Sequence, residues 1–207
     1  MEIEAIFWDF DGVILSSHAI REYGFKIALK KYPPNQVNQL MEYHRANNGW
    51  SRYVKFGYFF EKIRKESFTK DNVNKLASIY SKAVKSLLIN KSLLIKESMS
   101  FIQKKSSFYR MYIASGSDNE ELNQVCKGLG IDEYFHSIHG SPEPKTKILK
   151  RLLIEHHHEP SKCLMIGDAV NDYDAAMDNN MLFLGFNNPE VEKLSTIDFK
   201  LDKLLEM

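Results

Sequence analysis

The chain has 207 residues, of which 43% are hydrophobic and 27% are charged. This length suffices for one core domain with a modest insertion, and the apolar content is too high for a disordered chain. A net charge of +1 argues against a nucleic-acid or membrane-surface binder, which would carry a clear basic excess. Because no apolar run approaches ~18 residues and the first residues are acidic, we expect a cytoplasmic protein with no membrane partner.

Cysteine and histidine, the side chains that most often hold structural metals, indicate no such site. Cys126 and Cys163 lie in apolar segments without the short spacing of a zinc site. We therefore expect both to be reduced thiols that pack in the interior. The run of two glutamates and three histidines at residues 155–159 precedes Pro160. We interpret it as a solvated helix end rather than as a metal site or a tag.

Four short apolar runs predict buried strands, because each ends abruptly in polar residues. They lie at residues 3–8, 109–114, 163–166 and 181–186. Apolar residues at helical spacing fall between them, at 122–129 and 148–153. We predict an α/β fold with a doubly wound, Rossmann-like parallel sheet, which binds ligands at the carboxyl ends of its strands.

Residues 16–100 interrupt this alternation, since one crossover helix needs far fewer residues. Helical periodicity at 37–44 and 73–88 predicts an inserted α-helical cap domain over the strand ends. The Rossmann-like catalytic core would then comprise residues 1–15 and 101–207. The cap has 16 Lys and Arg against 6 Asp and Glu, and the core has 12 against 21. Two interpretations stay open: lysines keep the cap soluble, or a basic lid concentrates an anionic substrate over an acidic site.

Two pairs of aspartates follow predicted strands. Asp9 and Asp11 stand two apart, and Asp168 and Asp172 stand four apart where a turn opens into a helix. Carboxylates this close stay ionised only when a cation or hydrogen-bond donors share the site. Oxygen ligands without His or Cys suit Mg²⁺, so we predict that all four belong to a magnesium site. A helix N-cap or a turn would explain any one of them alone, but not four together.

Two predicted helix starts carry groups that suit a phosphate. Ser115 and Gly116 follow a strand, and a hydroxyl with loosened backbone N–H groups can hold an anion. Ser117 and Glu120 have the spacing of a capping box, which predicts that Ser117 caps the next helix. Lys145 is expected at the start of another helix, where a cation is electrostatically unfavourable. A lysine at this position is favourable if its ammonium neutralises a bound phosphate and a carboxylate. The alternative is that Lys145 is exposed to solvent and has no such role.

The chain resembles the haloacid dehalogenase superfamily in four motifs, taken in order. They are Asp9-Phe10-Asp11-Gly12-Val13, Ser115, Lys145, and Gly167-Asp168 with Asp172. Residues 16–100 stand where the phosphatase-like members, similar to phosphoglycolate phosphatase and β-phosphoglucomutase, insert a helical cap. Ser16, Gly116 and Ala169 depart from residues common in the family, but none of these departures removes a catalytic group.

The resemblance implies a Mg²⁺-dependent phosphoric monoester hydrolase that acts through an aspartyl phosphate. Asp9 would be the nucleophile, and Asp11 would be the general acid and then the general base. Mg²⁺ would be held by the Asp9 carboxylate, the Asp11 main-chain carbonyl and Asp168. Asp172 would support the metal.

The same resemblance places Ser115, Gly116 and Lys145 against the phosphoryl oxygens. Asp11 argues against dehalogenation, because the carbon–halogen hydrolases of the superfamily lack this second aspartate and the metal. A phosphosugar mutase shares all four motifs and stays open. So does a non-catalytic phospho-ligand binder, although a binder would gain nothing from two crowded carboxylates. Phosphonate cleavage would need a cap lysine that forms a Schiff base, which the lysine-rich cap neither supplies nor excludes.

Substrate specificity is expected in a polar, Gly-containing loop of the cap at residues 44–53. Arg45 and Arg52 would pair with a second anionic group, and Trp50 would stack on a sugar or base. An ordinary connecting loop whose Trp packs into the cap interior is an equal alternative. We expect a small phosphorylated metabolite such as a sugar phosphate as the substrate, and a monomer or a homodimer.

Overall fold

The computed structural model describes residues 3–198, 201 and 203. Its centre is a parallel sheet of five strands in the order β3-β2-β1-β4-β5. The strands are β1 (Ala5–Trp8), β2 (Arg110–Asp118), β3 (Ser137–Ser141), β4 (Cys163–Gly167) and β5 (Leu182–Gly185). The predicted α/β class is therefore confirmed, and β1 lies in the middle of the sheet.

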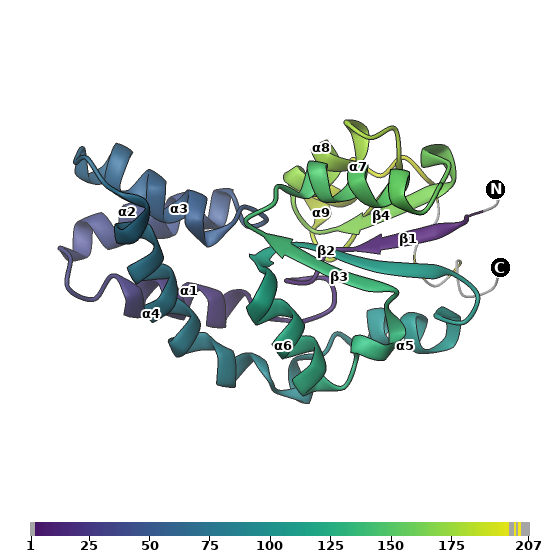
Figure 1. Cartoon of the computed structure of the whole chain (residues 1–207), viewed down its shortest axis with the longest axis horizontal. Coiled ribbons are helices and arrows are strands. Elements are labelled where there is room, and N and C mark those ends of the chain that lie inside the picture. The colour runs from purple at the N-terminus through teal and green to yellow at the C-terminus, as the bar shows by residue number, and fades with distance from the viewer. Residues whose placement is uncertain (1–2, 199–200, 202, 204–207) are drawn as a thin grey trace.

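Helices cover both faces of the sheet (Figure 1). One face packs against α5 (Lys96–Lys105) and α6 (Asn119–Leu129), and the other against α7 (Lys145–Glu155) and α8 (Val170–Met177). Successive residues of a strand point to opposite faces. Accordingly Ile6 and Trp8 join the apolar cluster on the α5 and α6 side, whereas Ala5 and Phe7 join the cluster on the α7 and α8 side. A short helix, α9 (Pro189–Glu192), follows β5.

The segment between β1 and α5 is helical and lies beyond the carboxyl ends of the strands (Figure 1). It consists of α1 (His18–Ala28), α2 (Pro34–Ala46), α3 (Arg52–Tyr58), the π-helical η1 (Phe59–Arg64) and α4 (Lys70–Leu88). Its interior is aromatic, with the Phe25 ring 4.8 Å from Tyr80 and 5.2 Å from Phe56, centroid to centroid. Gly24 permits the close approach of α1 to α4, because a Cβ there would lie 2.4 Å from Val84.

Three details differ from the expectations. The strand β3 was not predicted, because its sequence Ser-Ile-His-Gly-Ser has no apolar run. The strand β2 continues through Asp118, four residues beyond its predicted end. The helix α5 begins at Lys96 and packs Phe101 against Trp8 of the sheet, so a core boundary at residue 101 cuts this helix.

Cys126 and Cys163 are buried free thiols, as predicted. The histidine run follows the end of α7, as expected. His158 Nε2 and the Tyr112 hydroxyl share a 2.9 Å hydrogen bond, and the ring centroids of His156 and His136 lie 4.7 Å apart. Only His157 of the three is exposed. No helix in the described part of the chain is long and apolar enough to cross a membrane.

Candidate active site

The central strand β1 delivers Asp9 to the carboxyl edge of the sheet. Asp9 directly follows the strand, is 2% exposed, and its backbone N–H donates to Ile166 of β4 at 2.9 Å. A tight turn comes next, in which Gly12 has a φ of +82°. A Cβ on Gly12 would lie 2.1 Å from an Asp168 carboxylate oxygen, so glycine is required on both grounds.

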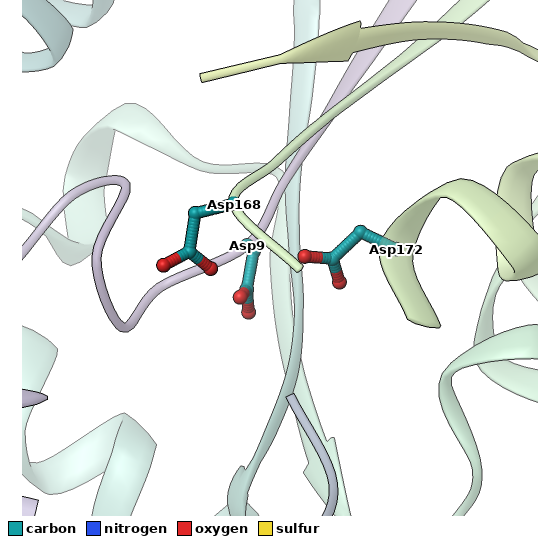
Figure 2. Close-up of side chains that lie close together, drawn as sticks. All are labelled: Asp9, Asp168 and Asp172. Atoms are coloured by element: carbon teal, nitrogen blue, oxygen red, sulfur yellow. The ribbon is translucent and has the colours of Figure 1, made fainter. Parts of the chain in front are cut away.

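Three aspartates converge at this edge. Asp9, Asp168 and Asp172 come from the ends of β1 and β4 and the first turn of α8, and their carboxylate oxygens lie within 4.8 Å of one another. Figure 2 shows the Asp172 carboxylate extending from α8 toward the other two. Asp172 also accepts the Ala169 backbone N–H at 3.1 Å, which fixes it in place. All three are 6% exposed or less.

Lys145 is the cation in contact with this cluster. It opens α7, as predicted, and its Nζ lies 3.0 Å from Asp9 Oδ1 and also pairs with Asp172. It is 7% exposed, which removes the alternative of a solvent-exposed lysine. Burial alone would lower the pKa of this amine, but Asp172 and Asp9 outweigh that effect and raise it. The two carboxylates therefore favour the ammonium form of Lys145.

One ammonium does not balance the acidic cluster. Burial raises the pKa of Asp9 to about 7, opposed by Lys145 and reinforced by Asp172 and Asp11. Burial likewise raises the pKa values of Asp168 and Asp172. Raised carboxyl pKa values mean that the ionised cluster needs a further cation.

The donor set fits Mg²⁺ in that place. Asp9 Oδ1 is buried and accepts no well-aligned hydrogen bond, even though Lys145 lies 3.0 Å away. Three buried carboxylates, with no sulfur or imidazole among them, form a set of hard ligands suited to Mg²⁺. His18 is the closest imidazole: its Nε2 lies 2.9 Å from Asp168 Oδ2, and this hydrogen bond raises the pKa of His18.

Asp11 faces away from the acidic cluster, toward the helical segment. Its carboxylate accepts hydrogen bonds from Arg21 Nε at 2.8 Å, Ser117 Oγ at 2.6 Å and the Ser17 hydroxyl. Burial would raise the pKa of Asp11, but Arg21 and these donors together hold it well below its usual range. Asp11 is thus a carboxylate in this conformation, and it can hold a proton only after its pairing with Arg21 weakens.

The strand β2 places a second set of predicted residues at the same edge. Ser115 is 1% exposed, and its hydroxyl oxygen accepts the Ser117 backbone N–H at 3.1 Å. The prediction that Ser117 caps the following helix is wrong. The N-cap is Asp118, which accepts the Glu121 N–H at 3.0 Å, because β2 runs one residue further and leaves the Ser117 hydroxyl to bind Asp11.

The loop between α2 and α3 lies directly against β2. A Cβ on Gly116 would lie 2.1 Å from the main-chain oxygen of Gly49, and a Cβ on Gly49 would lie 1.9 Å from the side-chain oxygen of Asn171. These two glycines therefore permit a contact that any larger side chain would block. The cavity between the sheet edge and the helical segment has a volume of about 30 Å³, which holds solvent but not a phosphosugar. A substrate of that size requires the helical segment to move.

The cavity is lined from both sides. The sheet side contributes Asp9, Asp11, Ser115, Gly116 and Asp168. The helical side contributes, among others, His18, Arg21, Phe25, His44, Trp50, Arg52, Lys55 and Tyr80. Of the three loop residues expected to contact substrate, Trp50 lies at the cavity and is 46% exposed, so it does not pack into the cap interior. Arg45 is not brought there: it forms two hydrogen bonds with Glu22 on the surface.

Arg52 reaches the cavity, but as part of a buried ion-pair network. Its guanidinium donates to both carboxylate oxygens of Glu121, at 2.9 and 2.6 Å, and to Ser81 at 2.6 Å. Arg21 donates to the same Glu121 at 2.6 Å. One carboxylate of α6 therefore holds arginines of α1 and α3, which joins the helical segment to the core.

Sequence reasoning missed Arg21, Lys55 and Glu121. Each lies in a helix with a polar surface, and only the tertiary packing turns its side chain inward. The available signal was periodicity: Glu121 precedes the apolar Leu122 at the start of α6 and is 4% exposed. The sequence marks the two asparagines after β5 only as polar residues. In the structure the Asn187 side chain donates to the Gly12 carbonyl at 3.0 Å, and the Asn188 side chain donates to the Asp168 carbonyl at 2.8 Å.

The parallel α/β sheet carries a buried acidic cluster and a lysine at its carboxyl edge, which is the usual ligand position of this fold class. The family model for haloacid dehalogenase-like hydrolases matches residues 3–178, and the chain belongs to this family. A comparison with curated protein sequences returned no match.

Solved structures share the fold over almost the whole chain. A haloacid dehalogenase-like hydrolase, SP0104 from Streptococcus pneumoniae, is 22% identical with a TM-score of 0.71, covering 99% of this chain and 97% of its own. β-Phosphoglucomutase from Clostridium difficile is 23% identical with a TM-score of 0.74, covering 99% and 96%. CbbY from Rhodobacter sphaeroides, in complex with xylulose-(1,5)bisphosphate, is 17% identical with a TM-score of 0.75, covering 97% and 94%.

Proposed function

We propose that this protein is a Mg²⁺-dependent phosphatase that hydrolyses a small phosphorylated metabolite through an aspartyl phosphate on Asp9. The observation that carries the proposal is the Asp9 carboxylate itself. It is buried at the end of the central strand, has an oxygen without a well-aligned hydrogen bond, and lies beside Lys145 and two further carboxylates. This is the environment of a nucleophile that must approach an anionic phosphoryl group.

The reaction divides into two displacements. Asp9 attacks phosphorus, an aspartyl phosphate bond forms, and the bond from phosphorus to the leaving oxygen breaks. Asp11 supplies the proton to that oxygen and then takes a proton from the water that hydrolyses the aspartyl phosphate. Ser115 and Lys145 bind the phosphoryl oxygens. Because Asp11 is paired with Arg21 when the cavity is closed, substrate entry must loosen that pair before Asp11 can carry a proton.

The residues that would hold the metal are Asp9, Asp168 and Asp172, together with the Asp11 main-chain carbonyl. When bound, Mg²⁺ would orient the phosphoryl group and offset its repulsion by the Asp9 carboxylate. The contact of Asp172 with Lys145 suits a supporting role, in which it positions the lysine as well as the metal.

The test is inorganic phosphate release from a panel of phosphosugars, nucleotides and phospho-acids, with Mg²⁺ or with EDTA. Wild type is compared with Asp9→Asn and with Asp132→Asn, an exposed control with the same change of charge. We expect release that needs the metal, survives in Asp132→Asn, and falls by roughly a thousandfold or more in Asp9→Asn. The panel includes phosphosugars because two similar structures are named as a phosphosugar mutase and as a sugar bisphosphate complex.

No release from any compound by a folded wild type would overturn the phosphatase proposal. Isomerisation of a phosphosugar in its place would indicate the mutase, which uses the same nucleophile chemistry.

A further inference from the structure

The segment between β5 and α9 contacts both loops that carry the acidic cluster. Asn187 Nδ2 donates to the main-chain carbonyl of Gly12 at 3.0 Å, in the turn after β1. Asn188 Nδ2 donates to the main-chain carbonyl of Asp168 at 2.8 Å, in the loop after β4. Two adjacent side chains therefore hold one carbonyl in each of the two loops.

These two loops are not held together by the sheet itself. The last paired residues of β1 and β4 are Trp8 and Ile166, so Gly12 and Asp168 both lie beyond the paired strands. The loops are nevertheless in contact, because a Cβ on Gly12 would lie 2.1 Å from Asp168 Oδ2. The Gly12 carbonyl is also one peptide away from the Asp11 carbonyl, a candidate metal ligand. A small shift of either loop would therefore change the distances between the candidate ligands.

The backbone conformation of Asn187 does not account for its hydrogen bond. Asn187 has a φ of +57°, in the left-handed region that asparagine and glycine adopt more readily than other residues. Asn180, after α8, has nearly the same φ of +55°. The conformation explains why asparagine is tolerated at residue 187, but it does not require the side chain to donate to Gly12.

Helix capping likewise accounts for only half of the Asn188 side chain. Its Oδ1 accepts the Glu190 backbone N–H at 3.2 Å and so caps α9. Serine, threonine or aspartate would cap a helix as well as asparagine does. An ionised aspartate has no donor, whereas the amide of asparagine accepts and donates at once. The bond from Nδ2 to Asp168 is therefore a contact that the cap does not need.

We propose that Asn187 and Asn188 are positioning residues that set the spacing between the turn at residues 9–12 and Asp168, and with it the affinity of the acidic cluster for a divalent cation. The inference rests on the proposed function, in which that cation is Mg²⁺. Both asparagines act through main-chain carbonyls and are not themselves ligands. Hydrogen bonds that hold metal ligands in place typically change metal affinity or activity 10–100-fold.

The first measurement reads metal binding without turnover. Mn²⁺ is titrated into the protein, and the free ion is followed by electron paramagnetic resonance. Asn187→Gly keeps a residue that adopts a positive φ, and Asn188→Ser keeps a residue that caps helices, but each removes the amide. We expect each substitution to raise the Kd for Mn²⁺ by about tenfold. The same Kd in wild type and both variants, or no binding by wild type, overturns the inference.

Two matched controls separate positioning from local structure. Asn180→Gly makes the first substitution at an exposed residue with nearly the same φ. Asn90→Ser makes the second at the exposed cap of the short helix η2 (Lys91–Leu93). Both controls should bind Mn²⁺ as wild type does, and chemical denaturation compares the stability of all four variants. Lower stability of the Asn187 and Asn188 variants with an unchanged Kd for Mn²⁺ would show a merely structural role and overturn the inference.

The second measurement is phosphate release as a function of Mg²⁺ concentration. We expect Asn187→Gly and Asn188→Ser to need about tenfold more Mg²⁺ for half-maximal activity. Excess Mg²⁺ should restore much of kcat, because every ligand is still present. A fall in kcat with an unchanged Mg²⁺ requirement overturns the inference and leaves the phosphatase proposal intact. If wild type releases no phosphate from any compound, the proposed function fails, and weaker Mn²⁺ binding by the two variants still supports their positioning role.

Discussion

The two sides of the cavity are built on different principles. The core wall, formed by Asp9, Lys145, Asp168 and Asp172, rests on strand ends and first helical turns that the sheet fixes in place. The cap wall, formed by Arg21, His44, Arg52 and Lys55, rests on the helices α1, α2 and α3, which lie outside the sheet. Under the proposed function, the groups that react with any phosphate ester lie on the core wall, and the groups that distinguish one ester from another lie on the cap wall.

The two walls also differ in how their charges are balanced. The core wall carries an excess of carboxylate, which fits a metal ion, and the cap wall carries an excess of cation, which fits an anion. Glu121 links them, because this core carboxylate binds arginines from two cap helices. Under the proposed function, a substrate with Mg²⁺ would supply to each wall the charge that it lacks.

The largest effect on activity and stability is expected when the core wall loses its lysine. Lys145→Met leaves two buried carboxylates without their ammonium. We expect phosphate release to fall about 10²–10³-fold and the free energy of unfolding to fall by ~3–5 kcal/mol. Steady-state kinetics and chemical denaturation measure the two effects. Lys147→Met, exposed on the same helix, is the control, and similar values for both variants would contradict the assignment.

The contact between the walls is tested next, at Gly116. A methyl group there would lie 2.1 Å from the Gly49 main-chain oxygen, so the closed cavity could not form. We expect Gly116→Ala to lower kcat/KM on the order of 100-fold, since a misplacement of ~1 Å has that cost. In Gly57→Ala the added Cβ meets the Phe68 ring at an ordinary 3.6 Å, and this variant should keep its activity. Full activity in Gly116→Ala would show that closure over β2 is unnecessary.

The cap wall should show its own sensitivity to acid, through His44. Burial lowers the pKa of His44 to about 3, Lys55 and His18 add to the effect, and Glu22 and Asp11 oppose it. Between pH 6.5 and pH 3 the unfolded chain therefore binds more protons at this position than the folded protein does, so stability is lost as the pH falls.

The size of this loss is measured against a neutral replacement. His44→Gln should lose less unfolding free energy than wild type between pH 7 and pH 5, by on the order of 1–2 kcal/mol. Denaturant titrations at each pH give the difference. Parallel curves for the two proteins would mean that His44 is not the titrating group.

The smallest expected effect concerns the whole charge of the cap. Between about 0.01 M and about 0.15 M salt the Debye length falls from ~30 to ~8 Å. If the 16 basic residues of residues 16–100 attract an anionic substrate, kcat/KM should fall several-fold over that range while kcat changes little. A kcat/KM that does not change with salt would indicate that the lysines serve only to keep these helices soluble.

The sequence predicts the core wall far better than the cap wall. Asp9, Asp168 and Lys145 are recognisable because polar residues follow apolar runs at strand ends, and parallel strands bring those ends together. Arg52 was expected to bind substrate from its place in a loop, but the structure places it in α3 with a carboxylate partner 69 residues away. Helical periodicity marks which face of a helix is buried, but it does not show that an arginine will be buried against a partner on another helix.

The fold shows the same contrast. The strands with long apolar runs were found, whereas β3 was missed because its pairing with β2, rather than its own composition, makes it a strand. The capping error at Ser117 has a similar cause, since a hydroxyl that fits a helix cap locally is drawn instead to Asp11 across the site.

The position of β1 in the sheet has a consequence for folding. Ala5 pairs with Arg110 on one side and with Cys163 on the other, so both neighbours of the strand lie more than a hundred residues further along the chain. Contacts so distant in sequence form slowly, because a long loop must close before either is made. By contrast, α1 and α4 pack together within residues 18–88. We expect the cap helices to associate first and the nucleophile to reach its position only when β4 joins the sheet, so that catalytic competence is among the last properties the chain acquires.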